Sequence, residues 1–207
     1  NIRQLNTKEN IRACHTLCEF LLTYKDPRIV NIYEMTGASK GDTSLPYESR
    51  YEGLPCGTKP PTATIPLSES SRYKQLFNDP VYLMNKAEIL FLEAEAYARL
   101  QKPADAKTKY EDAVKAAFNR WKESQGKADD FLDTGKPYAF NSTNTESMLK
   151  SILIQKWVSY ARANSLDGVF DRNRTGIPEI SNIKTVRVSD KAKERKLSDG
   201  YVLGTLV

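Results

Sequence analysis

One short stretch of the sequence carries residue types that bind metals. Cys14, His15 and Cys18 lie close together, and the four-residue spacing of the cysteines places both thiols on one face of an expected helix. His15 is rotated by about 100° from Cys14 around the helix axis, and no fourth ligand follows at a usable spacing. The pattern favours cysteines packed in a core, and we expect no metal site.

Carboxylates are plentiful, and Asp129 and Asp130 form an adjacent pair. Adjacent residues do not face each other on a helix, whereas retaining glycosidases hold two carboxyl groups roughly 5–5.5 Å apart across a cleft. His15 is the only histidine, and the sequence has no Gly-rich phosphate loop. We therefore expect no catalytic residues and predict that the chain is not an enzyme.

Aromatic rings gather in an irregular stretch between residues 37 and 80, which holds six of the ten prolines and four of the ten glycines. Long loops without periodicity are often functional, and rings on loops can stack on sugar faces while nearby polar groups bond hydroxyls. The alternative is that these rings only fix the loop to the helices beneath it. The candidate ligand-binding residues are Tyr47, Arg50, Tyr51, Tyr73, Phe77 and Asn78.

Hydrophobic periodicity predicts the elements that position these residues. Thr7 is the expected N-cap of the first helix, and Thr143 to Glu146 has the form of a capping box. The expected elements are a helix over 7–24, an irregular loop region over 37–80, a helical hairpin over 81–118, a helix over 143–163 and a C-terminal loop region over 164–207.

The hairpin has the spacing of a tetratricopeptide repeat, with small and large residues alternating along two helices that break near Pro103. A single pair of this kind cannot bury its face alone, so we expect partner repeats in sequence outside this chain. The residues that match the repeat are Leu90, Ala94, Tyr97, Ala106, Tyr110 and Ala113.

The charge pattern argues against a nucleic-acid partner. The net charge is +5 and the sequence pI is about 9.0 over 207 residues, but the basic residues are interleaved with acidic ones. The densest basic stretch, from Lys184 to Lys196, also contains Asp190 and Glu194. No apolar run approaches the ~20 residues of a membrane-spanning helix, and no export signal is evident.

Three stretches of the sequence match a known family. Gln155-Lys156-Trp157 and, further on, Arg174-Thr175-Gly176-Ile177-Pro178 resemble a Gln-Lys-Trp and Arg-Arg-Thr-Gly-Tyr-Pro signature, with Asp167 and Asp171 at its acidic positions. Ala94-Glu95-Ala96 resembles the end of a family helix. Asp26-Pro27-Arg28 and the Gly-containing segment from Tyr51 to Gly57 resemble the third stretch.

On these residues the chain resembles the C-terminal half of the SusD/RagB family of outer-membrane lipoproteins, in its second SusD-like branch. Asn173, Ile177 and Val169 depart from the usual Arg, Tyr and Trp. The resemblance implies a mainly α fold of tetratricopeptide-like hairpins with long irregular loops, in which residues 1–207 form the C-terminal part of a larger domain.

The resemblance also implies a function. Family members are non-catalytic, surface-exposed proteins that bind glycan and deliver it to a TonB-dependent outer-membrane transporter during polysaccharide utilisation. The lipid anchor would lie upstream, outside this chain. No cofactor is implied, and calcium remains open. The alternative is a tetratricopeptide scaffold that binds proteins or peptides, including peptide as the nutrient.

We interpret the matching signature residues as fold-forming, because a buried Trp and an Arg that bonds nearby carbonyls explain the pattern without a ligand. These residues are Gln155, Lys156, Trp157, Asp171, Arg174 and Gly176.

Overall fold

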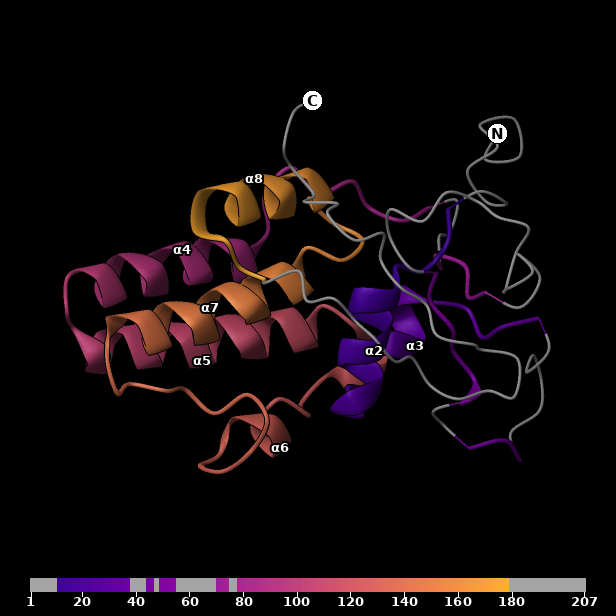
Figure 1. The fold of residues 1–207 in the computed structure, drawn as a ribbon, viewed down its shortest axis with the longest axis horizontal. Coiled ribbons are helices and arrows are strands. Elements are labelled where there is room, and N and C mark those ends of the chain that lie inside the picture. The colour runs from indigo at the N-terminus through magenta and orange to yellow at the C-terminus, as the bar shows by residue number, and fades with distance from the viewer. Residues whose placement is uncertain (1–10, 38–43, 47–48, 55–69, 75–77, 179–207) are drawn as a thin grey trace, which may run out of the picture. The chain divides into compact units, whose positions relative to one another are not determined.

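The computed structural model describes residues 11–37, 44–46, 49–54, 70–74 and 78–178, and these are mainly helical (Figure 1). They fall into two compact units, one ending at Asp79 and the other within Pro80–Glu179. Within the described residues, extended segments pair only through isolated bridges. No helix in these ranges is both long and apolar enough to cross a membrane. The predicted mainly α fold is confirmed.

The first unit is built around helix α2 (His15–Thr23) and the short helix α3 (Ile29–Ile32). The predicted helix over 7–24 is wrong at its start, because Cys14 is the extended N-cap of α2 and Thr7 lies outside the described residues. Ala13 instead donates its N–H to Ser71 at 2.9 Å and accepts from Leu54 at 2.8 Å. Backbone pairing with distant segments thus replaces the first turns that the hydrophobic period indicates.

A buried ion pair fixes the turn after α2. The side chains of Asp26 and Arg28 are 0% and 1% exposed, and Arg28 Nη2 lies 2.6 Å from Asp26 Oδ2. The Arg28 backbone N–H also donates to Asp26 Oδ1 at 2.9 Å. The Asp26-Pro27-Arg28 motif therefore holds a turn together, since a fully buried charge pair requires this degree of hydrogen bonding.

Gly53 lies against the start of α2. A Cβ atom added at Gly53 would lie 2.5 Å from His15 Cα, and the neighbouring Leu54 carbonyl accepts the His15 N–H at 2.8 Å. The close spacing of these two backbones leaves no room for a side chain. The close approach of the Gly53 and His15 backbones therefore requires a glycine at position 53.

The second unit begins with the predicted hairpin, which the structure confirms as α4 (Lys86–Arg99) and α5 (Pro103–Asn119). Asn85 caps α4 by accepting the Glu88 N–H at 3.0 Å, and Pro103 occupies the first turn of α5. Four alanines at the contact, all 0% exposed, let the two helices approach closely. They are Ala94, Ala98, Ala106 and Ala113.

Helix α7 (Thr145–Ser159) follows the short helices η3 (Lys122–Ser124) and α6 (Asp129–Leu132) and packs on α4 and α5. The predicted capping box is wrong: Asn144 caps α7 and accepts the Ser147 N–H at 2.8 Å. Thr143 instead donates its hydroxyl to Asn141 Oδ1. The helix also ends at Ser159 rather than near residue 163.

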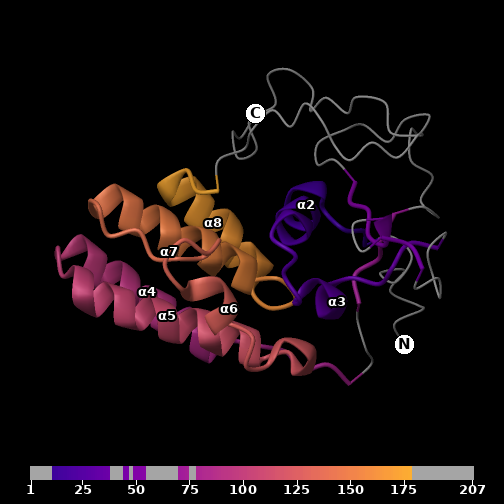
Figure 2. The same ribbon diagram turned by 90° about the horizontal axis from the view of Figure 1, so that it is seen from below.

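Helix α8 (Ser165–Thr175) corrects the prediction of a loop region from residue 164 onward. It ends at Gly176, whose φ of 75° gives the left-handed C-cap that glycine adopts readily. Figure 2 shows α8 beside α7, with which it is in contact. The sequence did not predict α8 because the segment is polar. The helix is stabilised instead by ion pairs with Lys156 and Glu95 of neighbouring helices.

Candidate functional site

The structure buries one of the predicted ligand-binding rings. Tyr51 is 2% exposed, and burial raises the pKa of its hydroxyl group. Tyr73 is half-buried, with its ring edge-on to Tyr33 at a centroid distance of 5.7 Å. Tyr47 and Phe77 lie outside the described residues. The Tyr51 ring therefore packs in the core and cannot present a face to a sugar.

The two polar candidates lie differently. Arg50 is half-buried and donates Nε–H to the Leu45 carbonyl at 3.0 Å, which fixes its own loop. Asn78 is exposed in a turn at the end of the first unit. Their role in ligand binding, like that of Tyr73, stays a prediction.

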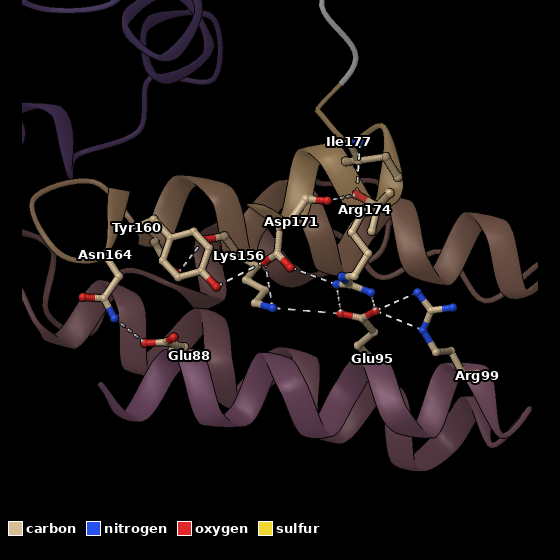
Figure 3. Close-up of polar contacts among 11 residues, drawn as sticks. Glu88, Glu95, Arg99, Lys156, Tyr160, Asn164, Asp171, Arg174 and Ile177 are labelled. Carbon is tan, nitrogen blue, oxygen red and sulfur yellow. Dashed lines mark hydrogen bonds and ion pairs between the residues drawn. The ribbon is translucent and has the colours of Figure 1, made fainter. Parts of the chain in front are cut away.

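The residues of the family signature come together in the second unit, where charged side chains from α4, α7 and α8 meet (Figure 3). Lys156 is 2% exposed, and its Nζ lies 2.8 Å from Asp171 Oδ2 and 4.0 Å from Glu95 Oε2. A lysine this deeply buried requires carboxylates near its ammonium group, and Asp171 and Glu95 provide them.

Two arginines complete what we call the signature network, composed of Glu95, Arg99, Lys156, Asp171 and Arg174. Arg174 binds Glu95 through both terminal nitrogens, at 2.6 and 2.9 Å, and Asp171 at 2.9 Å. Arg99 donates to Glu95 Oε1 at 2.7 and 3.0 Å. Such two-pronged pairs fix orientation as well as charge, so the network joins α8 to α4 and α7.

The network shifts the acidity of its carboxyl groups. Burial would raise the pKa of Glu95, but hydrogen bonds from Arg174 and Arg99 outweigh it and lower the pKa overall. Asp171 behaves alike: burial opposes the hydrogen bonds from Lys156 and Arg174, which lower its pKa. Burial, together with the nearby Asp171 charge, raises the pKa of the Tyr160 hydroxyl, which donates to Asp171 at 3.2 Å. Both carboxylates are therefore ionised at neutral pH and cannot act as general acids.

The fold-forming interpretation of the signature needs two corrections. Arg174 binds carboxylates rather than backbone carbonyls, and Trp157 is half-buried rather than buried, beside Gly168 of α8. Gln155 is 2% exposed, as a structural residue requires. The signature therefore acts chiefly through ion pairs between helices.

The cysteines considered as metal ligands, Cys14 and Cys18, do not lie on one helical face. Cys18 is buried in α2, but Cys14 precedes the helix, so the expected shared helical face does not form. Within the described ranges, no group of three His, Cys, Asp or Glu side chains could hold a metal ion. Asp129 and Asp130 are exposed, and Asp129 pairs with Lys115 at 3.0 Å.

Acid should weaken the second unit through the signature network. The lowered pKa values mean that Glu95 and Asp171 contribute stability that is fully present above their ordinary pKa values of 4.5 and 3.8. This contribution is lost as the pH falls through the still lower folded-state values. We expect the free energy of unfolding, from urea titrations, to drop below about pH 4.5. Glu95→Gln should flatten this drop, whereas Glu146→Gln, at an exposed site, should keep the original slope.

Glu95 lies at the centre of the network, although its match to the family's Ala-Glu-Ala triplet predicted no role for it. A signal was present: Glu88 and Glu95 lie seven residues apart, on the same face of α4 as Phe91 and Ala98, and all four are buried. A charged residue on an apolar helical face requires a partner. The sequence could not name the partner, because Arg174 is 79 positions away.

Comparison with known proteins identifies the class. Residues 1–197 match the SusD-like family described as starch-binding and associating with the outer membrane. The chain therefore belongs to this SusD-like family. No curated protein matches the sequence.

Solved structures from Bacteroides share the fold. A SusD homologue from Bacteroides ovatus superposes with a TM-score of 0.66 at 20% identity, over 83% of this chain and 40% of that one. A homologue from Bacteroides thetaiotaomicron has a TM-score of 0.65 at 21% identity, over 82% of this chain and 39% of that one. A homologue from Bacteroides fragilis has a TM-score of 0.63 at 24% identity, over 80% of this chain and 40% of that one. The chain thus spans about 40% of the length of these relatives.

Proposed function

We propose that this chain is part of a non-catalytic protein that binds glycan or oligosaccharide at the bacterial outer membrane during nutrient uptake. The family match over residues 1–197 carries this proposal, because that family is described as starch-binding and associating with the outer membrane. The signature network is consistent with this proposal. Its residues form ion pairs within the fold, so the ligand would bind at other surfaces of the protein.

The proposal includes a location and a partner. The protein is held at the cell surface by an N-terminal lipid anchor outside this chain, and it passes its ligand to a TonB-dependent outer-membrane transporter. Copurification of the full-length protein with a barrel transporter from detergent-solubilised membranes tests the partner. Recovery of the protein alone under conditions that preserve other membrane complexes would count against it.

Calorimetry on the full-length protein tests the ligand. Malto-oligosaccharides and a panel of other neutral and charged glycans should include at least one that binds, and chromatography should show it unchanged after incubation. Titration with and without a calcium chelator determines whether calcium assists. Conversion of the glycan to shorter products would contradict the non-catalytic assignment.

A peptide ligand is the second candidate, because the α4–α5 hairpin has tetratricopeptide spacing and such repeats bind peptides when stacked. A peptide mixture run in the same calorimetry separates the two. Binding of peptides with no response to any glycan would favour a scaffold or a peptide-uptake protein.

A further inference from the structure

The second unit contains a cleft between the start of α4 and the second half of α5. Its volume is about 680 Å³, within the usual range for small-molecule sites. Polar side chains, one ring and the amides of two asparagines line it, which suits a ligand rich in hydroxyl groups. The polar lining includes Tyr82, Asn85, Lys86, Lys115, Asn119 and Arg120.

Positive charge dominates this lining. The lining contains three cationic side chains, Lys86, Lys115 and Arg120, and one acidic side chain, Asp112. A second carboxylate, that of Asp129, pairs with Lys115 at 3.0 Å. Lys86 is the first residue of α4. A cation at a helix N-terminus is unfavourable for the helix dipole, so Lys86 does not serve the stability of α4. A cation in this position would instead attract an anionic group in the cleft.

Arg120 is held rigidly at the other side. Its guanidinium carbon lies 5.5 Å from the centre of the Tyr82 ring and 4.6 Å from that of Trp121. Its Nη2 donates to the Ala161 carbonyl at 2.9 Å. A guanidinium group fixed by rings loses little freedom when it binds a ligand, so Arg120 is oriented in advance.

Asn85 supplies an unused donor in the same wall. The residue is 9% exposed, and its Oδ1 accepts the Glu88 N–H. Its Nδ2 is buried and has no hydrogen-bond acceptor among the described residues. Buried polar groups normally have a partner, and a ligand oxygen reached by a small rotation of the amide would provide it.

We propose that this cleft is a subsite for an anionic saccharide, a sugar that carries a carboxylate or a sulfate group. The inference rests on the proposed function and names the ligand class and the site. Lys86 and Lys115 attract the anionic group, Arg120 adds positive charge from the cleft wall, and the Asn85 amide donates to a ligand oxygen. The site lies on the hairpin, apart from the predicted candidates between Tyr47 and Asn78 in the sequence.

The full-length protein is titrated by calorimetry with three short oligosaccharides of equal length: an oligogalacturonide, a sulfated chondroitin fragment and a neutral malto-oligosaccharide. At least one anionic sugar should bind more tightly than the neutral one, and its affinity should fall as salt is raised. The two anionic sugars distinguish carboxylate from sulfate.

Two variants connect this binding to the cleft. Asn85→Asp keeps the capping oxygen, since Asp caps helices as well as Asn, but it replaces the donor by an acceptor and adds negative charge. We expect about tenfold weaker binding or more, with an unchanged thermal midpoint. Lys86→Gln with Lys115→Gln should weaken binding by a similar factor. Lys107→Gln with Lys122→Gln, at exposed positions of α5 and η3 outside the cleft, should not.

The outcomes separate the two proposals. Anionic-sugar affinity that is identical in wild type, Asn85→Asp and the cleft lysine variant would overturn the cleft site and leave glycan binding intact. Tight binding of the neutral sugar alone would likewise overturn only the anionic subsite. Failure of all three saccharides and of every glycan in the wider panel to bind would overturn both.

Discussion

Replacing Asp171 with Asn is expected to lower the free energy of unfolding by about 3 kcal/mol, the lower end of what breaking a buried ion pair costs. The Lys156 side chain is 2% exposed, and after the change its nearest remaining carboxylate is Glu95 at 4.0 Å. A buried ammonium group without a close partner is costly. Urea unfolding of both proteins at neutral pH measures the difference.

Two further variants make this result specific. Asp130→Asn, the same change at an exposed site, should alter stability by less than about 0.5 kcal/mol. Lys156→Met combined with Asp171→Asn should be more stable than Asp171→Asn alone, because removing the lysine also removes the unpaired charge. Equal stability of Asp171→Asn and Asp130→Asn would show that the network contributes nothing to the fold.

Replacing Gly53 with Ala is expected to destabilise the first unit by about 3 kcal/mol, the upper end of the usual cost of overpacking. The added Cβ would lie 2.5 Å from His15 Cα and 2.7 Å from its nitrogen. Both are backbone atoms at the start of α2 and cannot rotate away. The hydrogen bond from the His15 N–H to the Leu54 carbonyl should break, and amide hydrogen exchange at His15 should accelerate.

Gly168→Ala is the matched control. A Cβ atom there would meet Tyr160 Cδ2 at 3.4 Å and Trp157 Cδ1 at 3.8 Å, which is ordinary contact. Because Ala favours helix over Gly by roughly 1 kcal/mol, this variant should be as stable as the wild type or more so. Slow exchange at His15 in Gly53→Ala would mean that the two backbones lie further apart.

The residues of the family signature act mainly within the fold of the second unit. Lys156, Asp171 and Arg174 neutralise one another and Glu95 within the second unit, so their presence indicates a shared scaffold. On the proposed function, we expect ligand choice to depend on residues outside the signature. Surfaces such as the proposed α4–α5 cleft can change without disturbing the network, because its residues are not part of it.

Elements with local causes were predictable. The α4–α5 hairpin follows from apolar periodicity and from Pro103, whose missing N–H is harmless in the first turn of a helix. The turn at Asp26-Pro27-Arg28 was predictable from another local effect of proline, which disfavours helical geometry in the residue before it. The expected capping box from Thr143 to Glu146 was wrong because the next residue, Asn144, is also of a type that caps helices well.

Elements that depend on distant residues were not predictable. Helix α8 has a Gly and many charged residues, and Glu95 and Lys156 from other helices pair with its Arg174 and Asp171. Ile11 to Cys14 follow a helical period, yet the backbone of Ala13 bonds to Leu54 and Ser71. Tyr51 resembles a ligand-stacking ring in sequence and is 2% exposed in the structure.

The sequence by itself determined the family, the helical hairpin and the residues that matter for the signature, because these follow from residue type and short-range spacing. Only the tertiary structure decided what those residues do. Ion pairs and close backbone approaches join positions tens of residues apart, as Arg174 and Glu95 do, and no local pattern specifies which charge meets which.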